Sequence, residues 1–153
     1  LALAGFLTAF LLAATAITAR AALGGDEVSI QSDVAAMSGK MAESAPGPAA
    51  PYKIKSFVTG NGATVREYVS PSGPIFGIAW QGRRPPDLKV LLGSYYPEFA
   101  AASGLKEHVN LHRDTFVGPN AIVMLSGRMG HLAGRAYVPA LAPSGVDAET
   151  VVK

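Results

Sequence analysis

The sequence contains no cysteine, a single tryptophan and few charged residues, which make up 16% of its 153 residues. Without cysteine the chain can form neither a disulfide nor a lipid-modified N-terminal cysteine, and it has no cysteine nucleophile. Basic residues exceed acidic ones by a formal net charge of only +2. A nucleic-acid or anionic-membrane surface needs a strongly basic stripe, so this balance argues against both kinds of partner.

The first 21 residues carry no charge before Arg20 and end at an Ala-x-Ala site. This pattern is typical of a secretory signal peptide, so we expect residues 1–21 to be removed and the mature chain to begin at Ala22. No basic region precedes Leu1, so the sequence is expected to start inside the signal. The alternative is a retained membrane anchor, because the uncharged run is just long enough to span a bilayer. Since the run is rich in Ala and Thr and ends at a cleavable site, we favour a periplasmic or secreted protein with no stable membrane insertion after cleavage.

The rest of the chain divides into four parts. Apolar residues at helical spacing predict a short helix at about 28–38, within an N-terminal helical segment 22–41. Residues 42–51 contain three prolines among small residues and are expected to be a linker. An α+β domain is predicted for residues 52–143 and a loose tail for residues 144–153.

Two turns predict the first three strands of the domain. Asn61-Gly62 is typical of a two-residue hairpin loop, since both positions of a type I′ turn need a positive φ. The stretch 70–73 has proline and glycine where a second turn requires them. With these turns Val58 faces Val65 across the hairpin, and aliphatic residues share one face. The predicted apolar face consists of Ile54, Val58, Val65, Val69, Phe76, Ile78 and Trp80.

The main helix is predicted just after these strands. Pro85 and Pro86 end the third strand, because proline cannot donate to a strand ladder and favours a helix start. Apolar residues then recur at helical spacing over about 88–103, a stripe able to cover the sheet. Pro97 is expected to break this helix near Tyr96.

The remaining residues alternate as strands do. Residues 107–112, "EHVNLH", predict one strand, and 121–138 predict two strands joined at 127–130, with Ser126 opposite His131. Together these elements give an α+β fold: an antiparallel β-meander sheet of five to six strands packed against one main helix, with a short N-terminal helix.

Four stretches of the sequence resemble those of a known family. They are "ALGG" at the expected mature start, "ATVREYVSPSGPIFGIAWQG", "PPDLKVLLGSYY" and "SGRMGHLAGRAYVP". In this order they are similar to the exported proteobacterial family called domain of unknown function 2844 (DUF2844). The resemblance spans about residues 22–143, nearly all of the expected mature chain. It implies an exported protein and assigns no catalytic residues, because the family has no assigned activity.

Glu67 is the candidate for a working carboxylate. The predicted register places it opposite Phe76 and toward the apolar face, where an unpaired carboxylate is costly and its pKa rises. Carboxylates with shifted pKa values occur often at functional sites. Two structural alternatives stay open: an ion pair with Arg128 or Arg135, or a register shifted by one that turns Glu67 toward water.

No catalytic set, metal site or cofactor is predicted. His108 and His112 lie too far apart on a strand to share a metal readily. Ser126 and His131 could face each other, yet no carboxylate is evident to orient the histidine. The lack of a triad, metal set or acid-base pair leaves enzymatic activity uncertain and favours a protein that is not an enzyme.

The predicted binding surface is the sheet face opposite the core, where Lys55, Arg66 and Tyr68 would form a basic patch with aromatic neighbours. Trp80 would add an aromatic contact of the kind that carries energy at interfaces, or would form part of the core. We therefore expect an exported, non-enzymatic module that binds an envelope or secreted protein, or a glycan. The alternative is a small periplasmic hydrolase or ligand-binding protein that uses Glu67 in a pocket under the main helix.

Overall fold

The computed structural model of the chain describes residues 23–42, 50–104 and 113–153. The expected signal peptide, most of the predicted linker and the predicted strand at 107–112 lie outside these residues. Within the described parts of the chain, no helix is long and apolar enough to cross a membrane.

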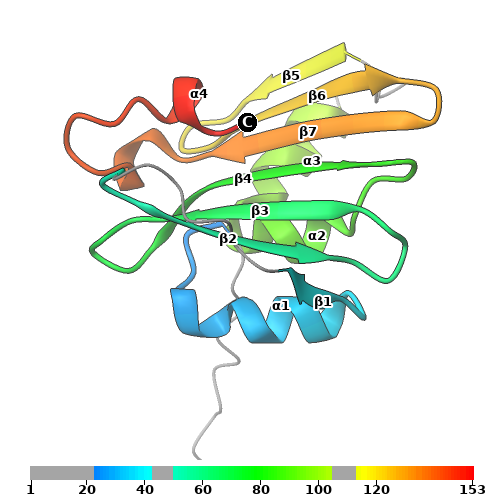
Figure 1. Cartoon of the computed structure of the whole chain (residues 1–153). Coiled ribbons are helices and arrows are strands. Elements are labelled where there is room, and N and C mark those ends of the chain that lie inside the picture. The colour runs from blue at the N-terminus through cyan, green and yellow to red at the C-terminus, as the bar shows by residue number, and fades with distance from the viewer. Residues whose placement is uncertain (1–22, 43–49, 105–112) are drawn as a thin grey trace, which may run out of the picture.

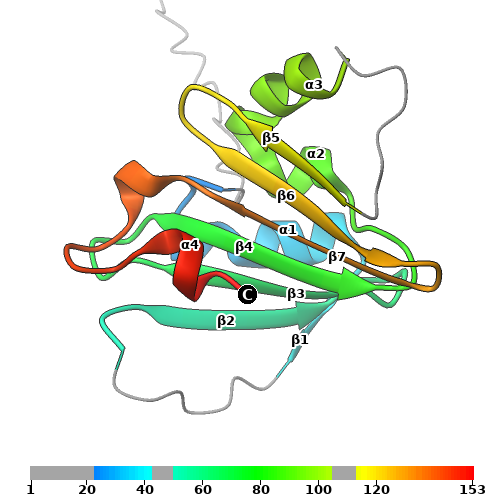
Figure 2. The same ribbon diagram turned by 90° about the horizontal axis from the view of Figure 1, so that it is seen from above.

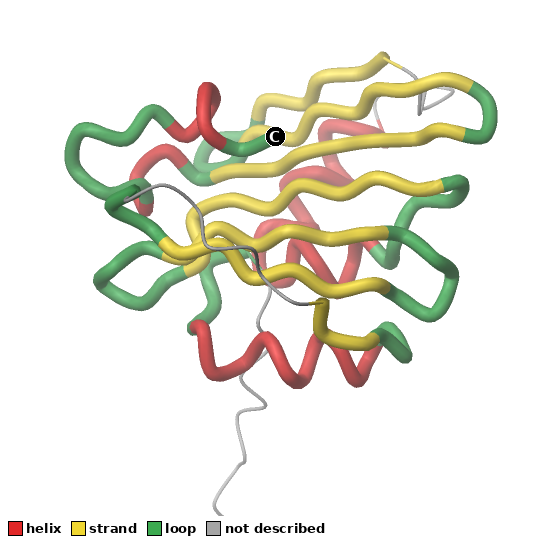
Figure 3. The backbone as a smooth tube through the Cα atoms, viewed as in Figure 1, coloured by secondary structure: helices red, strands yellow, loops and turns green. Residues whose placement is uncertain are grey.

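The strands form one antiparallel sheet with the order β1-β2-β3-β4-β7-β6-β5 (Figure 1). Figure 3 shows this sheet as a single layer. The predicted α+β class is confirmed, but the sheet has seven strands rather than five or six. Edge strand β1 has only three residues, too few to show alternation in the sequence. The strands are β1 (Lys40–Ala42), β2 (Lys53–Val58), β3 (Thr64–Val69), β4 (Ile75–Gly82), β5 (Arg113–Val117), β6 (Ile122–Arg128) and β7 (His131–Tyr137).

The strand order shows that the sheet is more than a simple meander. Strand β4 pairs with β7, although residues 83–130 separate the two strands in the chain. After β4 the chain leaves the sheet through α2 (Leu88–Leu92), η2 (Gly93–Tyr95) and α3 (Tyr96–Gly104). It re-enters at the far edge as β5 and works back through β6 to β7.

Most helices lie on one side of the sheet (Figure 2). This side, the helix-covered face, carries α2, α3 and the N-terminal elements η1 (Glu27–Ser29) and α1 (Ile30–Ala36). On the opposite side, the open face, the chain passes from η3 (Pro139–Leu141) to the short helix α4 (Ala148–Val151). The predicted N-terminal helix at 28–38 therefore corresponds to η1 and α1.

The main core lies between the sheet and the helices of the helix-covered face. Ile30 and Val34 of α1 and Leu91 and Leu92 of α2 pack against buried side chains of the central strands. The strands contribute Phe57, Val65, Val69, Ile75, Ile78, Trp80, Phe116, Val123, Leu125 and Ala136. The predicted helix stripe thus covers the sheet as expected, although the helix is not continuous.

The break in the main helix comes one turn before the predicted position. Asp87 caps α2 by accepting hydrogen bonds from the backbone N–H groups of Lys89 and Val90, at 2.9 and 3.2 Å. Gly93 ends α2 with φ of 49°, a value that glycine adopts readily. Pro97 then lies in the first turn of α3, where its missing N–H is not needed.

The predicted register of β2 is wrong by one residue. Phe57 pairs with Val65 and Val58 with Thr64, so the hairpin loop spans residues 59–63 instead of 61–62. The Thr59 side chain stabilises this wider loop through hydrogen bonds with the backbone of Ala63. A shift of one residue exchanges the two faces of a strand. Phe57 is therefore fully buried in the core, whereas Ile54 and Val58, predicted inward, are 36% and 40% exposed.

The face of Phe76 is also corrected. Strand β3 pairs with β4 so that Glu67 lies opposite Ile78 and Val65 opposite Trp80, but the register shifts between Tyr68 and Val69. This bulge turns Phe76 to the open face, where it packs beside Tyr68. In the β6–β7 hairpin the pairing is displaced by two residues, so Ser126 lies opposite Ala133. A displacement of two residues leaves each side chain on its predicted face.

The C-terminal residues were predicted to form a loose tail. They form part of a second core on the open face instead. Ala148 and Val152 are buried against Tyr68, Phe76, Ala79 and Tyr137. A Cβ atom on Gly77 would collide with Val152, so the missing side chain at that position makes room for it. Asp147 caps α4 by accepting from the backbone N–H of Glu149 at 3.1 Å.

Candidate functional site

The structure divides the five predicted site residues between the two faces of the sheet. Lys55, Glu67 and Trp80 belong to the helix-covered face, whereas Arg66 and Tyr68 belong to the open face. The predicted patch of Lys55, Arg66 and Tyr68 is therefore wrong as a single surface. The cause is the shifted register of β2, which pairs Lys55 with Glu67 and turns it away from Arg66.

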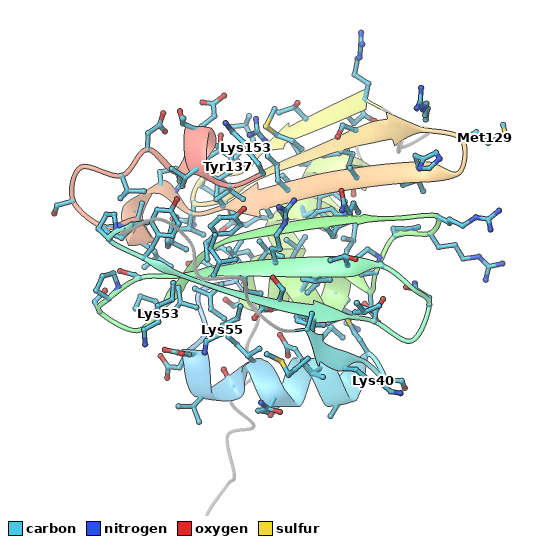
Figure 4. All side chains as sticks on the ribbon, viewed as in Figure 1. Lys40, Lys53, Lys55, Met129, Tyr137 and Lys153 are labelled. Carbon is cyan, nitrogen blue, oxygen red and sulfur yellow. The ribbon has the colours of Figure 1, made fainter. Side chains whose placement is uncertain are left out.

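Lys55 holds the N-terminal helices to the edge of the sheet. Its ammonium group lies 3.2 Å from a carboxylate oxygen of Glu27 in η1, and Lys53 lies 3.1 Å from the other oxygen. Figure 4 shows both lysines on β2, above the start of the N-terminal helical segment. Hydrogen bonds from Lys53 and Lys55 lower the pKa of Glu27. Lys55 is thus paired within the chain, although it shares the single Glu27 carboxylate with Lys53.

Tyr68 and Trp80 both have structural roles. The Tyr68 hydroxyl donates to the backbone carbonyl of Lys153 at 2.8 Å and accepts from its backbone N–H at 3.1 Å. Tyr68 is only 2% exposed and anchors the C-terminal residues to the open face. The Trp80 indole lies against the backbone of Gly134, where a Cβ atom would collide with the ring. Of the alternatives for Trp80, the core position is the one found.

Glu67 is fully buried, and neither of its carboxyl oxygens has a hydrogen-bond partner in the part of the chain that the structure describes. Burial, together with the nearby charge of Asp33 in α1, raises the pKa of Glu67 to about 9. The carboxyl is therefore neutral near pH 7. Both structural alternatives are wrong. Glu67 does not face water, and among the described residues it forms no ion pair with Arg128, which is exposed, or with Arg135, whose guanidinium is bound to carbonyl oxygens on the open face.

A hollow of about 380 Å³ on the open face brings four positive charges together. We call it the cationic hollow and define it by Arg66, Arg113, Arg135 and Lys153, which come from β3, β5, β7 and the C-terminal residues. Thr115 and Ser126 also line it. Figure 4 shows Lys153 at the C-terminal end of the chain, in front of the upper strands of the sheet.

The positions of two arginines of the cationic hollow follow from the strand register. Ala79 of β4 pairs with both Arg66 and Arg135, so the two arginines lie in one row across the open face. Arg135 is oriented by its donors, which reach the carbonyl oxygens of Glu149 and Val152 at 2.8 and 3.1 Å. No carboxylate among the described residues forms an ion pair with any of the four cations. Within residues 23–42, 50–104 and 113–153, their charge is therefore not balanced by an ion pair.

A second hollow of about 410 Å³ adjoins the first. Gln81 and Ala133 line both hollows, so the two are contiguous. The second hollow adds Arg83 and His131 near the β6–β7 loop, and we call it the loop hollow. Sequence reasoning named Arg66 as a candidate binding residue but not Arg113, Arg135 or Lys153. The pattern carried no signal for Arg113, because residues 113–115 are three consecutive polar residues and do not alternate.

The remaining candidates for chemistry do not assemble in the described parts of the chain. Ser126 pairs with Ala133 and His131 with Arg128, so the predicted pairing of Ser126 with His131 is wrong. No group of three or more His, Asp or Glu side chains that could hold a metal is found in residues 23–42, 50–104 and 113–153. His108 and His112 lie outside these ranges. Glu67 lines neither of the two hollows.

Comparison with known proteins identifies a family. The family described as "Protein of unknown function (DUF2844)" matches residues 19–151, which is nearly the whole chain. The chain therefore belongs to the DUF2844 family. No curated protein and no solved structure matches it.

Proposed function

We propose that this member of the DUF2844 family is an exported, non-enzymatic binding module that holds an anionic envelope or secreted partner on the open face of its sheet. The observation that supports this proposal is the cationic hollow, in which four positive groups converge without an acidic partner among the described residues. The export part of the proposal comes from the signal-like sequence of residues 1–21.

The chemistry of the cationic hollow suits carboxylates and other oxyanions. A guanidinium group presents several N–H donors in a planar fork, which matches the two oxygens of a carboxylate. Arg66 and Arg113 make no hydrogen bond or ion pair through their side chains among the described residues, so their donors are available to a partner. Thr115 and Ser126 offer hydroxyl groups beside them. A partner with several negative groups would therefore gain charge-assisted hydrogen bonds at this face.

The hydrolase alternative has less support. A substrate would have to reach the carboxyl of Glu67, which is sealed between the sheet and the N-terminal helical segment. The chemistry of a neutral, buried carboxyl fits a general acid only where a substrate can approach it. We therefore do not assign Glu67 a catalytic role.

A charge-reversal experiment tests the binding proposal. The purified protein is titrated with soluble polyanions, polygalacturonate and polyglutamate among them, by isothermal calorimetry. Arg66→Glu/Arg113→Glu is expected to lower the affinity at least about tenfold, because each substitution removes a charge-assisted hydrogen bond. The matched control is Lys40→Glu/Lys89→Glu, which makes the same charge change at exposed positions outside the hollows.

Two outcomes would overturn the binding proposal. One is that no polyanion binds the wild-type protein. The other is that both double variants weaken binding equally, since binding would then depend on net charge and not on the cationic hollow. The export proposal is tested separately by fractionating the host cells and measuring the intact mass, which is expected to correspond to a chain that begins at Ala22.

A further inference from the structure

We propose that the partner is a linear acidic glycan, built of carboxylated sugars, that lies along one groove formed by the cationic hollow and the loop hollow. This inference rests on the proposed function and adds the class of the ligand and the extent of its site. The observations that carry it are the continuity of the two hollows, the spacing of their charges and the chemistry of the side chains between those charges.

The groove is continuous because a row of small and polar residues crosses the sheet on the open face. Thr64 pairs with Gln81, Gln81 with Ala133, Ala133 with Ser126, and Ser126 with Arg113. Gln81 and Ala133 lie in the middle of this row and line both hollows. No large side chain separates the cationic hollow from the loop hollow at this row, so a chain-like ligand can occupy both.

The positive charges recur at regular intervals across the sheet. Arg66 lies on β3, Arg135 on β7 and Arg113 on β5, with one strand between each successive pair. Since neighbouring strands lie about 4.8 Å apart, their backbone positions are separated by about 10 Å across the strands. This is about the length of a disaccharide. In a chain of acidic sugars, the carboxylate of every second sugar would therefore lie in step with these arginines.

Hydroxyl and amide side chains occupy the space between the charges. Thr64, Gln81, Thr115 and Ser126 line the two hollows and can each donate and accept hydrogen bonds. The sugar rings between two carboxylates carry hydroxyl groups, which need partners of this kind when they leave water. The lining therefore matches both the charged and the uncharged groups of an acidic glycan.

Two other polyanions fit the groove less well. Single-stranded nucleic acid binds through successive bases stacked on exposed aromatic rings. Among the residues that line the two hollows, Trp80 is 3% exposed and the exposed ring is the single imidazole of His131, so the groove offers no row of rings for successive bases. A protein partner usually inserts aromatic or aliphatic anchors into an apolar pocket. In the cationic hollow Leu125 is 5% exposed, and the half-buried Met124, between Arg135 and Thr115, offers one apolar side chain rather than an apolar pocket.

The test measures affinity as a function of ligand length. Unbranched oligogalacturonates of increasing length are titrated into the wild-type protein, with polyglutamate and single-stranded DNA as the competing polyanions. We expect affinity to rise with oligosaccharide length until both hollows are filled and then to level off. We also expect the long oligogalacturonates to bind at least about tenfold more tightly than either competitor at equal charge.

A pair of neighbouring arginines supplies the matched variants. Arg83 lines the loop hollow, whereas Arg84 is exposed and lines neither hollow. Arg83→Glu is expected to weaken long oligosaccharides about tenfold and leave the shortest ones unchanged, since only long chains reach the loop hollow. Arg84→Glu makes the same charge change on the same connection and is expected to leave both unchanged.

The results separate this inference from the proposed function. Tighter binding of polyglutamate or DNA, affinity that does not depend on length, or equal effects of Arg83→Glu and Arg84→Glu would overturn the glycan assignment. If Arg66→Glu/Arg113→Glu still abolished binding in those cases, the open face would remain an anion-binding surface. If the wild-type protein bound no polyanion, both proposals would be wrong.

Discussion

The two faces of the sheet differ in what covers them and in how their charges are balanced. On the helix-covered face, α1 and α2 bury the aliphatic side chains of the central strands, and the lysines at its edge are paired with Glu27. On the open face, the C-terminal residues cover one end only, and the cations of the hollow have no acidic partner among the described residues. The helix-covered face is thus closed by the chain itself, while the part of the open face around the cationic hollow is not covered by the described residues.

This difference shows that a buried ionisable side chain and one that lines an open hollow have different roles: only the second can contact a ligand. Glu67 is an unusual carboxyl, but it lies where only the protein can contact it. Arg66, the residue directly before Glu67 on the same strand, lines the cationic hollow on the open face. Successive residues of a strand point to opposite sides, so neighbours in sequence belong to different environments.

The largest difference in stability between the two faces is expected from substituting one residue on each side of β2. Phe57→Ala should destabilise the protein by about 4 kcal/mol, because it empties space in a closed core. Ile54→Ala, on the other side of the same strand, should cost less than about 1 kcal/mol, because Ile54 is 36% exposed. Urea unfolding monitored by circular dichroism gives both values. Equal losses would mean that β2 does not have the register described above.

The buried carboxyl predicts a pH dependence of stability. The pKa of Glu67 is about 9 in the folded protein, whereas the ordinary value of 4.5 applies to the unfolded chain. Between these two pH values the folded state therefore holds a proton that the unfolded state has lost. Stability contributed by this group is full below about pH 4.5 and is lost as the pH rises through about 9. Glu67→Gln should remove this slope and be more stable than wild type by about 3 kcal/mol at pH 8.

The control for Glu67→Gln is Glu98→Gln. The Glu98 carboxylate accepts hydrogen bonds from Asn120, which lower its pKa, so its charge does not change between pH 5 and 9. Its substitution should leave the slope of stability against pH in place. A wild-type protein whose stability is constant from pH 5 to 9 would show that Glu67 is hydrated or paired in solution.

Tyr68→Phe tests how firmly the C-terminal residues close one end of the open face. The substitution removes two hydrogen bonds to the backbone of Lys153 and should cost about 1 kcal/mol. Amide hydrogen exchange should become faster in residues 148–153 and stay unchanged in α1. Faster exchange in both regions would contradict the view that the two faces are closed independently.

The smallest effect is expected at the paired lysines. Lys55→Ala removes one of two cations beside Glu27 and should change stability by less than about 0.5 kcal/mol, because exposed ion pairs contribute little. The pKa of Glu27 should rise toward its ordinary value, which an NMR titration of its carboxyl measures. Binding of polyanions should be unaffected, in contrast to Arg66→Glu/Arg113→Glu.

Turn chemistry and periodicity predicted much of this architecture, but not every register. The proline hinge and the inward position of Glu67 were predicted because proline geometry and strand alternation are local. The faces of β2 were not, because Thr59 closes a loop wider than Asn61-Gly62 suggests and lets Phe57 enter the core. The cationic hollow escaped prediction for a different reason. Its residues come from strands that only the β4–β7 pairing brings together.

The pairing of β4 with β7 also has a consequence for how the chain folds. The centre of the sheet cannot form until residues 131–137 are available to β4, and the second core needs Val152 as well. Such non-local contacts slow folding, because a long segment must be closed into a loop before the contacts form. Synthesis would therefore deliver nearly the whole chain before its centre could condense. Strands β1 to β4, which are synthesised before β7, would thus wait for that last strand before the centre of the sheet is complete.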